Sequence, residues 1–349
     1  MSLLIYGANG YSGALIAAHA VERGLRPILA GRREEAIRPL AERLGLEHRS
    51  FALDRPEAIE SGLEGASVVL NCAGPFSRTA QPLVDGCLRV RAHYLDITGE
   101  VMVFSAVAAR DAEASSAGVM LLPGAGFDVV PSDCLAAHLH HRLPSAVELR
   151  LAFRASGGLS RGTALTSLES AAAGGLVRRK GVLTRVPAGH RTITVDFGRG
   201  PVKAIAIPWG DVFTAHVTTG IPDIEVYIAV PPLTRLALRS TRLLGPLLRS
   251  QPVQRWLRAH IQSRIAGPDE TRRRTTRMRL WGEARDSRGH VAATRMQTPN
   301  GYELTRLTAV DLASRALAGD VRPGYQTPAK AYGADYILGF PEVTREDIL

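Results

Sequence analysis

Residues 2–13 read SLLIYGANGYSG, an apolar run that ends at Gly7 and is followed by two more glycines at three-residue intervals. This order is typical of a β-strand that leads into a phosphate-binding turn. In such a turn, Gly7 permits the tight bend, Gly10 lets the main chain approach a diphosphate, and Gly13 allows the next helix to pack closely. The stretch therefore predicts a dinucleotide site at the start of the chain.

The position of this glycine motif makes it more specific than its spacing alone. It follows a predicted strand and precedes a helix that begins near Ser12, whose free amides and positive end would face the phosphates. The predicted cofactor-binding residues of the turn are Gly7, Asn9, Gly10, Tyr11, Ser12 and Gly13.

The end of the second predicted strand indicates which dinucleotide is bound. Residues 28–30 are apolar and are followed by Gly31, Arg32 and Arg33. NAD sites carry a carboxylate there that accepts hydrogen bonds from the ribose 2′-hydroxyl, whereas paired guanidinium groups suit a 2′-phosphate. The alternative is a solvated arginine pair that opens a helix. We predict NADP(H) as the cofactor, with Arg32 and Arg33 on its 2′-phosphate.

The composition indicates a soluble protein of two domains. The chain has 349 residues, of which 45% are apolar, and its mean hydropathy is +0.00. The first residues lack the basic leader of a secretory signal, and no apolar run reaches about 18 residues. Three cysteines, Cys72, Cys87 and Cys134, lack metal-ligand spacing and favour a reducing compartment. We expect a cytoplasmic protein, and peripheral association with a membrane stays open.

Periodicity divides the chain into two kinds of structure. Short apolar runs alternate with amphipathic segments in the first third, as in a doubly wound parallel sheet. The strands predicted there are residues 3–6, 28–30, 49–52, 68–71, 93–96 and 119–122. Beyond Phe127, longer alternating runs predict a mixed sheet. Those strands are residues 147–155, 192–197, 202–207, 225–230, 276–285, 291–297 and 302–307.

The predicted fold class is therefore α/β, an N-terminal Rossmann domain with an inserted α+β substrate domain. We place the Rossmann domain at residues 1–127 and the substrate domain at 128–308. Residues 309–349 form a C-terminal segment that returns to the first domain.

Three further loops lie at the carboxyl ends of the predicted parallel strands, where doubly wound sheets hold their ligands. Asp54 follows the third strand and either contacts the adenine edge or caps the helix that starts near Pro56. Ala73, Gly74 and Pro75 follow the fourth, and their small side chains would let the cofactor lie close, unless they form a plain turn. Residues 96–100 follow the fifth and either cap the next helix or face the nicotinamide.

Five blocks of sequence together resemble the saccharopine-reductase-like oxidoreductases, and within them the branch of trans-acting enoyl reductases. The blocks are residues 7–13, 30–33, 71–76, 94–100 and 126–133, and residues 327–329 resemble the segment with which this family returns to its nucleotide domain. The resemblance implies NADPH-dependent reduction of a polarised double bond. Its substrate is a C=C of an enoyl thioester on an acyl carrier or CoA, or a C=N of an imine.

Such a reaction needs a group that supplies one proton and groups that stabilise developing charge. The candidate catalytic residues are Asp96, Asp128 and Ser132, with Asp133 beside them, and each is also a candidate helix cap or loop anchor. A Tyr three positions before a Lys, the pair of short-chain dehydrogenases, is absent. No metal is expected, because His138, His140 and His141 share one short stretch without other ligands at tetrahedral spacing.

The formal charge is +10, and residues 226–268 contain seven arginines and no Asp or Glu. We expect a basic helical hairpin at residues 233–265. Its arginines form a solvated face, a membrane-surface helix, or a docking surface for an acidic carrier protein or a CoA phosphate. Nucleic acid is disfavoured because no aromatic stacking surface accompanies the charge. A homodimer is compatible with the sequence, and a non-catalytic NADPH-binding, membrane-associated protein is the alternative to an enzyme.

Overall fold

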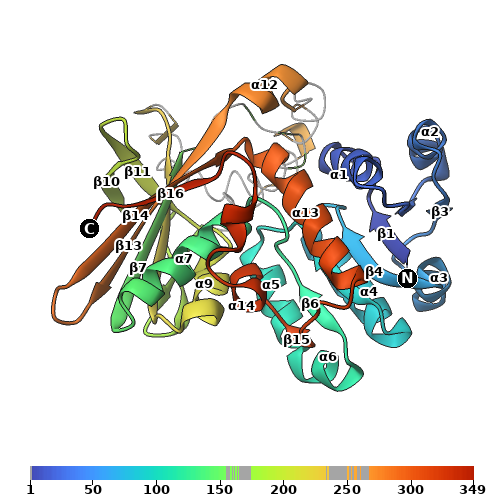
Figure 1. The fold of residues 1–349 in the computed structure, drawn as a ribbon, viewed down its shortest axis with the longest axis horizontal. Helices are drawn as coiled ribbons and strands as arrows, with labels where there is room; N and C mark the ends of the chain where they lie inside the picture. The colour runs from blue at the N-terminus through green and yellow to red at the C-terminus, as the bar shows by residue number, and fades with distance from the viewer. Residues whose placement is uncertain are drawn as a thin grey trace. The chain divides into compact units, whose positions relative to one another are not determined.

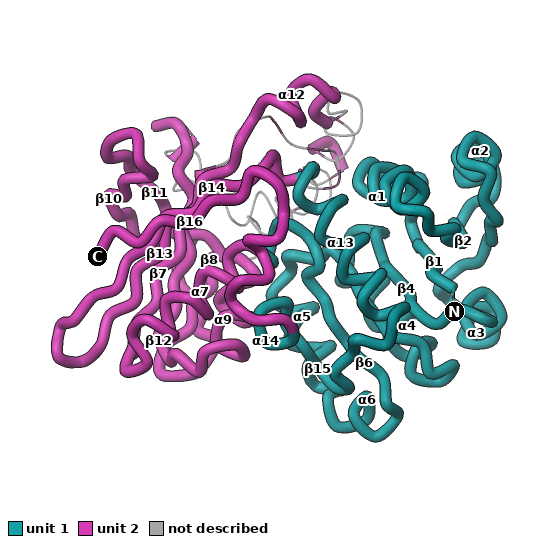
Figure 2. The backbone as a smooth tube through the Cα atoms, in the orientation of Figure 1, with its two compact units in different colours: residues 1–130, 302–331 teal, residues 131–301, 332–349 magenta. Residues whose placement is uncertain are grey.

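The computed structural model describes residues 2–154, 174–232 and 267–349, together with isolated positions between these ranges. The chain divides into two compact units, which Figure 2 shows in different colours. Unit 1 contains residues 1–130 and 302–331, and unit 2 contains residues 131–301 and 332–349. Unit 2 is thus inserted into unit 1. The last residues of the chain, 332–349, belong to unit 2, whereas the sequence analysis predicted that they return to the first domain.

Unit 1 is built on a parallel sheet of seven strands in the order β15-β6-β5-β4-β1-β2-β3. The strands are β1 (Ser2–Tyr6), β2 (Ile28–Gly31), β3 (His48–Ser50), β4 (Ala66–Asn71), β5 (His93–Asp96), β6 (Met120–Leu122) and β15 (Gly324–Tyr325). The order reverses between β1 and β4, which makes this a doubly wound sheet. The predicted six strands and the fold class are confirmed, and β15 is added by the returning chain.

The helices of unit 1 cover this sheet (Figure 1). They are α1 (Tyr11–Glu22), α2 (Glu34–Leu44), α3 (Pro56–Leu63), α4 (Phe76–Val90), α5 (Val101–Ala108), α6 (Asp111–Ala117), α13 (Gly301–Leu317) and α14 (Pro328–Tyr332). Helices α2 and α6 end at Gly45 and Gly118, both in the left-handed conformation that glycine adopts without a steric penalty.

Helix α13 corrects the prediction of a strand at residues 302–307. Over that short window apolar and polar residues alternate, but over the whole helix the buried positions recur every three or four residues. They are Leu304, Thr305, Thr308, Ala309, Val310, Leu312, Ala313 and Ala316. The helix packs against other parts of unit 1. The ring of Tyr302 contacts that of Tyr11 edge to face, and the Thr308 hydroxyl donates to the carbonyl of Ala125. The boundary between unit 2 and the returning part of unit 1 therefore lies at the start of α13, whereas the sequence analysis placed it at residue 308.

Unit 2 is built on a mixed sheet with the path β10-β11-β12-β7-β13-β14-β16, to which the β8–β9 hairpin adds through β12. Its strands are β7 (Ala146–Arg154), β8 (Gly175–Arg179), β9 (Val182–Val186), β10 (Thr192–Asp196), β11 (Pro201–Ile207), β12 (Asp223–Ala229), β13 (Arg277–Asp286), β14 (Val291–Pro299) and β16 (Thr344–Asp347). Among the strand pairs described in unit 2, the pair of β12 and β7 is parallel and the other pairs are antiparallel.

The helices described in unit 2 are α7 (Val130–Arg142), α9 (Asp211–Thr219), α12 (Glu270–Thr275) and the 3-10 helix η1 (Tyr336–Gly339). Helix α7 packs tightly on one face of the sheet, because a Cβ added to Gly282 of β13 would lie 2.5 Å from a methyl carbon of Leu139.

The opposite face of this sheet is concave. The Arg295 guanidinium of β14 donates to the carbonyl of Asp196 at 2.9 Å and pairs with its carboxylate at 3.0 Å, although Asp196 belongs to β10 and four strands lie between β10 and β14 along the path. The sheet therefore curls until β10 reaches β14. An apolar cluster fills the curl: Ala152, Val195, Phe197, Ala204, Ala206 and Tyr227, with Trp281 beside it.

Glu225 ties three segments of unit 2 together beside that cluster. Its side chain is only 3% exposed and accepts hydrogen bonds from Arg179, from His190 at 3.1 Å, from Arg191 at 3.4 Å and from the Tyr227 hydroxyl. Burial would raise the pKa of this carboxyl, but the hydrogen bonds from Tyr227 and His190 and the Arg179 charge outweigh burial and lower the pKa.

We expect Glu225→Gln to lower the free energy of unfolding by about 1–3 kcal/mol at pH 7, the usual cost of losing a charged hydrogen-bond partner. Because the pKa is lowered in the folded state, this stability is present above the ordinary value of about 4.3 and is lost on acidification below it. Urea denaturation at pH 7 and pH 4 should show the difference between variant and wild type shrink at the lower pH. Glu148→Gln is the control, since that carboxylate is 45% exposed.

The predicted basic hairpin at residues 233–265 lies largely outside the described residues. Within the described part of the chain, no helix combines the length and the apolar character needed to cross a membrane.

Candidate functional site

The turn between β1 and α1 has the geometry of a phosphate cradle. Gly7 has a φ of +81°, and a Cβ added to it would lie 2.7 Å from the backbone nitrogen of Ala73. A Cβ on Gly13 would lie 2.4 Å from the carbonyl oxygen of Gly7. Gly10 directly precedes α1 and has no side chain that could cap the helix. The first turn of α1 contains no acidic residue. The amides at this helix start are thus suited to a diphosphate.

We expect Gly13→Ala to abolish measurable NADPH binding and to lower the melting temperature. The added methyl group would force the turn away from α1, and overpacking of this kind costs about 1–3 kcal/mol. Fluorescence titration with NADPH and a thermal melt measure the two effects. Gly339→Ala is the matched control, because a Cβ at Gly339 meets nothing within 4 Å. Unchanged NADPH affinity in Gly13→Ala would contradict a cofactor role for the turn.

Arg32 and Arg33 follow β2 directly, and both side chains are exposed. Arg33 precedes α2 and lies 3.8 Å from Glu35. Burial raises the pKa of Tyr6 to about 12, the positive charge of Arg32 opposes this rise, and the charge of Asp54 adds to it. Arg32 and Asp54 are therefore close to the same tyrosine. Asp54 does not cap α3, because the residue before that helix is Arg55, so the helix-cap interpretation is wrong.

The loop after β4 is fixed by hydrogen bonds from several directions. The Asn71 side chain accepts the amide of Ala73 at 2.9 Å, and the Thr79 hydroxyl donates to the carbonyl of Ala73 at 2.6 Å. The peptide bond between Gly74 and Pro75 is cis. Ala73 lies against Gly7 of the phosphate turn, because a Cβ added to Gly7 would lie 2.7 Å from both the backbone nitrogen and the Cβ of Ala73.

Glu100 caps the start of α4 from a neighbouring loop. Its two carboxylate oxygens accept the backbone amides of Phe76 and Ser77, each at 2.9 Å. The residue before α4 is Pro75, whose side chain offers no acceptor, so the helix takes its cap from 24 residues further along the chain. At the start of α5, the Glu100 side chain does not cap its own helix, and the Thr98 hydroxyl accepts the amide of Glu100 at 3.0 Å.

Asp96 is fully buried at the end of β5 and is engaged on both oxygens. One oxygen accepts the amides of Thr98 at 3.0 Å and Gly124 at 2.9 Å, and the other accepts the Tyr94 hydroxyl at 2.9 Å. Burial raises the pKa of this carboxyl to about 6. Tyr94 also accepts from Asn71 at 3.2 Å. Asp96 therefore connects the loops that follow β4, β5 and β6.

Asp128 lies in the loop that follows β6 and is close to Gly99 in the loop that follows β5. A Cβ added to Gly99 would lie 2.9 Å from one oxygen of its carboxylate, so a side chain at position 99 would displace it. Asp128 is partly buried, and burial raises the pKa of its carboxyl to about 7. This loop is held from α13, whose Thr305 hydroxyl accepts the amide of Phe127 at 3.0 Å.

The remaining candidates belong to unit 2. Ser132 is buried on α7, and Asp133, also buried, accepts the Thr218 hydroxyl at 2.6 Å. His138 pairs with Asp347 at 2.8 Å. No group of three or more His, Cys, Asp or Glu side chains that could hold a metal occurs among the described residues. Cys72, Cys87 and Cys134 are free thiols, and burial raises the pKa of each.

Sequence analysis included Glu100 among residues 96–100 but did not predict that it caps α4, and it missed Thr305. The start of α4 carried a signal for the first, since a helix that begins after Pro75 must find its acceptors elsewhere. Thr305 could not be found, because its segment was predicted as a strand of the other domain.

Comparison with known proteins agrees with the geometry of unit 1. Residues 3–122 match the domain family described as "Saccharopine dehydrogenase NADP binding domain". The chain is 34% identical over 149 residues to the trans-acting enoyl reductase of Mycobacterium leprae, covering 40% of this chain and 36% of that protein. It is 32% identical over 148 residues to that of Mycobacterium ulcerans, covering 40% and 35%. The matched segment thus spans about a third of the length of these curated relatives.

Two solved structures share the fold of the whole chain. Apo saccharopine dehydrogenase (L-Glu forming) from Saccharomyces cerevisiae matches with a TM-score of 0.67 at 12% identity, covering 100% of both chains. Homospermidine synthase from Legionella pneumophila, in complex with NAD, matches with a TM-score of 0.68 at 11% identity, covering 99% of this chain and 91% of that one. The predicted resemblance and the predicted NADP-binding domain are confirmed.

Proposed function

Starting from a saccharopine dehydrogenase-type NADP-binding domain, we propose that this protein is an NADP(H)-dependent reductase that delivers hydride to a polarised C=C, the enoyl group of a thioester. The observation that carries the proposal is the partly buried Asp128, which lies against Gly99 beside the loops of the cofactor domain. Reduced nicotinamide supplies the hydride when it is bound. The protein must hold the cofactor, keep water away and supply a proton.

The cofactor is held by groups from four strand ends. The amides at the start of α1 bind the diphosphate, with Gly7, Asn9, Gly10, Tyr11, Ser12 and Gly13 forming the turn around it. Arg32 and Arg33 bind the 2′-phosphate, and Asp54 approaches the adenine edge. Ala73, Gly74 and Pro75 leave room for the nicotinamide half. In this assignment Glu100 already occupies the amides that begin α4, so the phosphates are directed to α1.

Asp128 is the proton donor in this proposal. Its pKa of about 7 leaves a substantial fraction of the carboxyl protonated near neutral pH, which is the condition for general acid catalysis. Asp96 is a positioning residue instead, because both of its oxygens are engaged and its side chain is fully buried. Ser132 remains the alternative donor, since its hydroxyl follows the same loop four residues later.

The sequence relatives favour reduction of a C=C over reduction of a C=N. The sequence relatives that share 32–34% identity are named trans-acting enoyl reductases, whereas the saccharopine dehydrogenase structure shares only 12% and shows the fold alone. A reductase that acts in trans receives its acyl group from a carrier domain. We therefore propose a carrier-tethered or CoA-linked acyl substrate.

The arginines of α12 support an acidic carrier as the partner. The side chains of Arg272 and Arg274 are 68% and 75% exposed, on a helix of unit 2 that contains three consecutive arginines. Arg272 lies 3.9 Å from Asp269, and Arg274 lies 2.8 Å from Glu270. Exposed arginines attract carboxylate-rich and phosphate-bearing surfaces. Residues 233–265 contain seven further arginines and no Asp or Glu.

NADPH oxidation by the full chain tests the reductase proposal. The assay compares a short enoyl-CoA, the same acyl chain on a carrier protein, a cyclic imine and the saturated acyl-CoA as control. We expect turnover with the enoyl substrates and none with the saturated control. Turnover of the imine alone would replace C=C reduction by C=N reduction. Binding to anionic liposomes in flotation, without turnover of any substrate, would overturn the enzyme proposal.

A further inference from the structure

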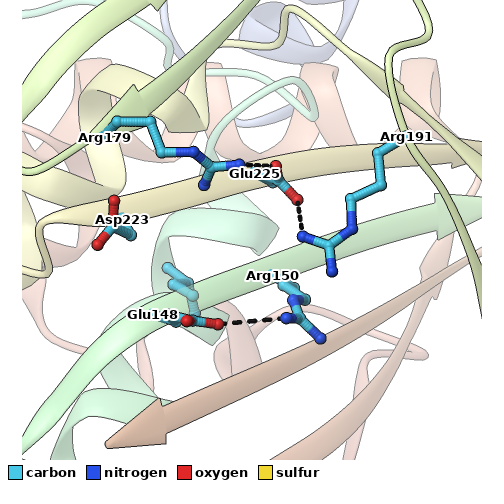
Figure 3. A pocket seen from close by; sticks show the side chains of 7 residues that line it. Glu148, Arg150, Arg179, Arg191, Asp223 and Glu225 are labelled. Carbon is cyan, nitrogen blue, oxygen red and sulfur yellow. Dashed lines mark hydrogen bonds and ion pairs between the residues drawn. The ribbon is translucent and has the colours of Figure 1, made fainter. Parts of the chain in front are cut away.

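A small pocket lies in unit 2, and none of the residues that line it takes part in the proposed reaction. It occupies about 270 Å³ and is lined by Glu148, Leu149, Arg150, Arg179, Arg191, Asp223 and Glu225. That volume equals roughly nine water molecules in the liquid, which suits a small metabolite rather than a drug-sized ligand. Figure 3 shows the charged side chains around it.

One end of the pocket is acidic. Asp223 of β12 and Glu148 of β7 are register partners on adjacent parallel strands, so both carboxylates project from the same face of the sheet. Asp223 accepts the backbone amide of Lys180 at 2.9 Å, and Glu148 pairs with Arg150 at 3.2 Å. Like charges opposite each other on neighbouring strands repel. A cationic group placed between Asp223 and Glu148 would relieve that repulsion.

The other end of the pocket is basic. Figure 3 shows the guanidinium groups of Arg150 and Arg191 on the side away from Asp223. Arg150 uses one terminal nitrogen for Glu148 and the other for Glu283, and Arg191 uses one for Glu225 at 3.4 Å. A guanidinium has five N–H donors, so both arginines retain donors for an anion.

Glu225 forms the wall between the two ends and does not take the place of a ligand. Its carboxylate is nearly fully buried and is saturated by Arg179, His190, Arg191 and Tyr227. The pocket is therefore polarised along the strands. Glu148 and Arg150 are two positions apart on β7 and their charged groups lie 3.2 Å from each other, so the acidic and basic ends meet at this ion pair.

We propose that this pocket binds a free α-amino acid, with the carboxylate on Arg150 and Arg191 and the ammonium group between Asp223 and Glu148. An α-amino acid carries its ammonium and carboxylate groups on the same carbon. It can therefore lie beside the Glu148–Arg150 ion pair, with each of its charged groups next to the side chains of opposite charge. A molecule with only one of the two charges would satisfy one end and leave the other unpaired.

Titration calorimetry on the full chain without nucleotide tests the proposal. The probes are L-alanine, L-glutamate and L-lysine, compared with propionate and ethylammonium, which each carry one of the two charges. We expect at least one amino acid to bind about tenfold or more tightly than either half-ligand, since each lost charged hydrogen bond costs about tenfold or more. Equal affinities for amino acids and half-ligands, or no binding of any amino acid, would overturn the proposal.

Two variants locate the ligand. Arg191→Gln and Asp223→Asn should each weaken amino-acid binding about tenfold or more. Both are compatible with folding, because Glu225 keeps three partners and asparagine still accepts the amide of Lys180 through Oδ1. Arg199→Gln is the matched control, an exposed arginine of the same unit that does not line the pocket. Unchanged affinity in both pocket variants, with melting temperatures like wild type, would place the ligand elsewhere.

Discussion

Replacing Arg32 and Arg33 together with alanine is expected to weaken NADPH binding about a hundredfold or more and to leave NADH binding within about threefold. Each charge-assisted hydrogen bond to the 2′-phosphate contributes roughly 1.5–3 kcal/mol, and about 1.4 kcal/mol corresponds to a factor of ten. Both side chains are exposed beside the end of β2, so their removal leaves no cavity in the sheet. Fluorescence titration with the two nucleotides measures the selectivity directly.

The single variants should not be equivalent. Arg32 is close enough to Tyr6 for its charge to influence the pKa of that hydroxyl, and Asp54 acts on the same group. Arg33 lies at the start of α2 near Glu35, so part of its charge is already balanced. We expect the larger loss from Arg32→Ala. Arg38→Ala is the control, a surface arginine between Glu34 and Glu42 on the same helix. Equal losses for NADPH and NADH would show that these arginines do not read the 2′-phosphate.

The parts of the fold that follow from local patterns were predictable. Strand, glycine turn and helix succeed one another within 20 residues at the start of the chain, and each constraint there is local. Gly45 and Gly118 end their helices in the left-handed conformation for the same reason. The strand predicted at residues 302–307 shows the limit of such patterns. A window of six residues fits both the two-residue period of a strand and the 3.6-residue period of a helix. The helical period becomes clear only over the 17 residues of α13.

Contacts between distant residues were not predictable from one sequence. Glu100 reaches the amides of Phe76 and Ser77, and Thr305 reaches Phe127 across 178 positions. The curl of the unit 2 sheet depends on Arg295 meeting Asp196, which no strand pattern encodes. For the candidate site, sequence therefore indicates the residue types at each strand end. The structure adds their contacts: Asp96 is engaged on both oxygens at the end of β5, and Asp128 lies against Gly99.

Asp128→Asn is expected to lower kcat for enoyl-thioester reduction about 10²–10⁴-fold, the usual contribution of a general acid. The amide is nearly isosteric with the carboxyl, so the contact with Gly99 is kept and NADPH affinity should not change. Ser132→Ala is the comparison, because Ser132 is the alternative donor. A large loss in Ser132→Ala with near-normal kcat in Asp128→Asn would transfer the role to the serine.

The pH dependence separates a proton donor from a residue that only shapes the loop. A general acid must be protonated, so kcat of the wild type should be constant below about pH 7 and fall tenfold per pH unit above it. The asparagine variant should lack that step. The stability of the wild type should also fall as pH rises, but over a lower pH range. Because burial raises the pKa in the folded state, the carboxyl destabilises the fold increasingly as pH rises from about 4 to 7. Asp128→Asn should therefore gain melting temperature relative to wild type across that range while it loses activity, a combination that a purely structural role would not produce.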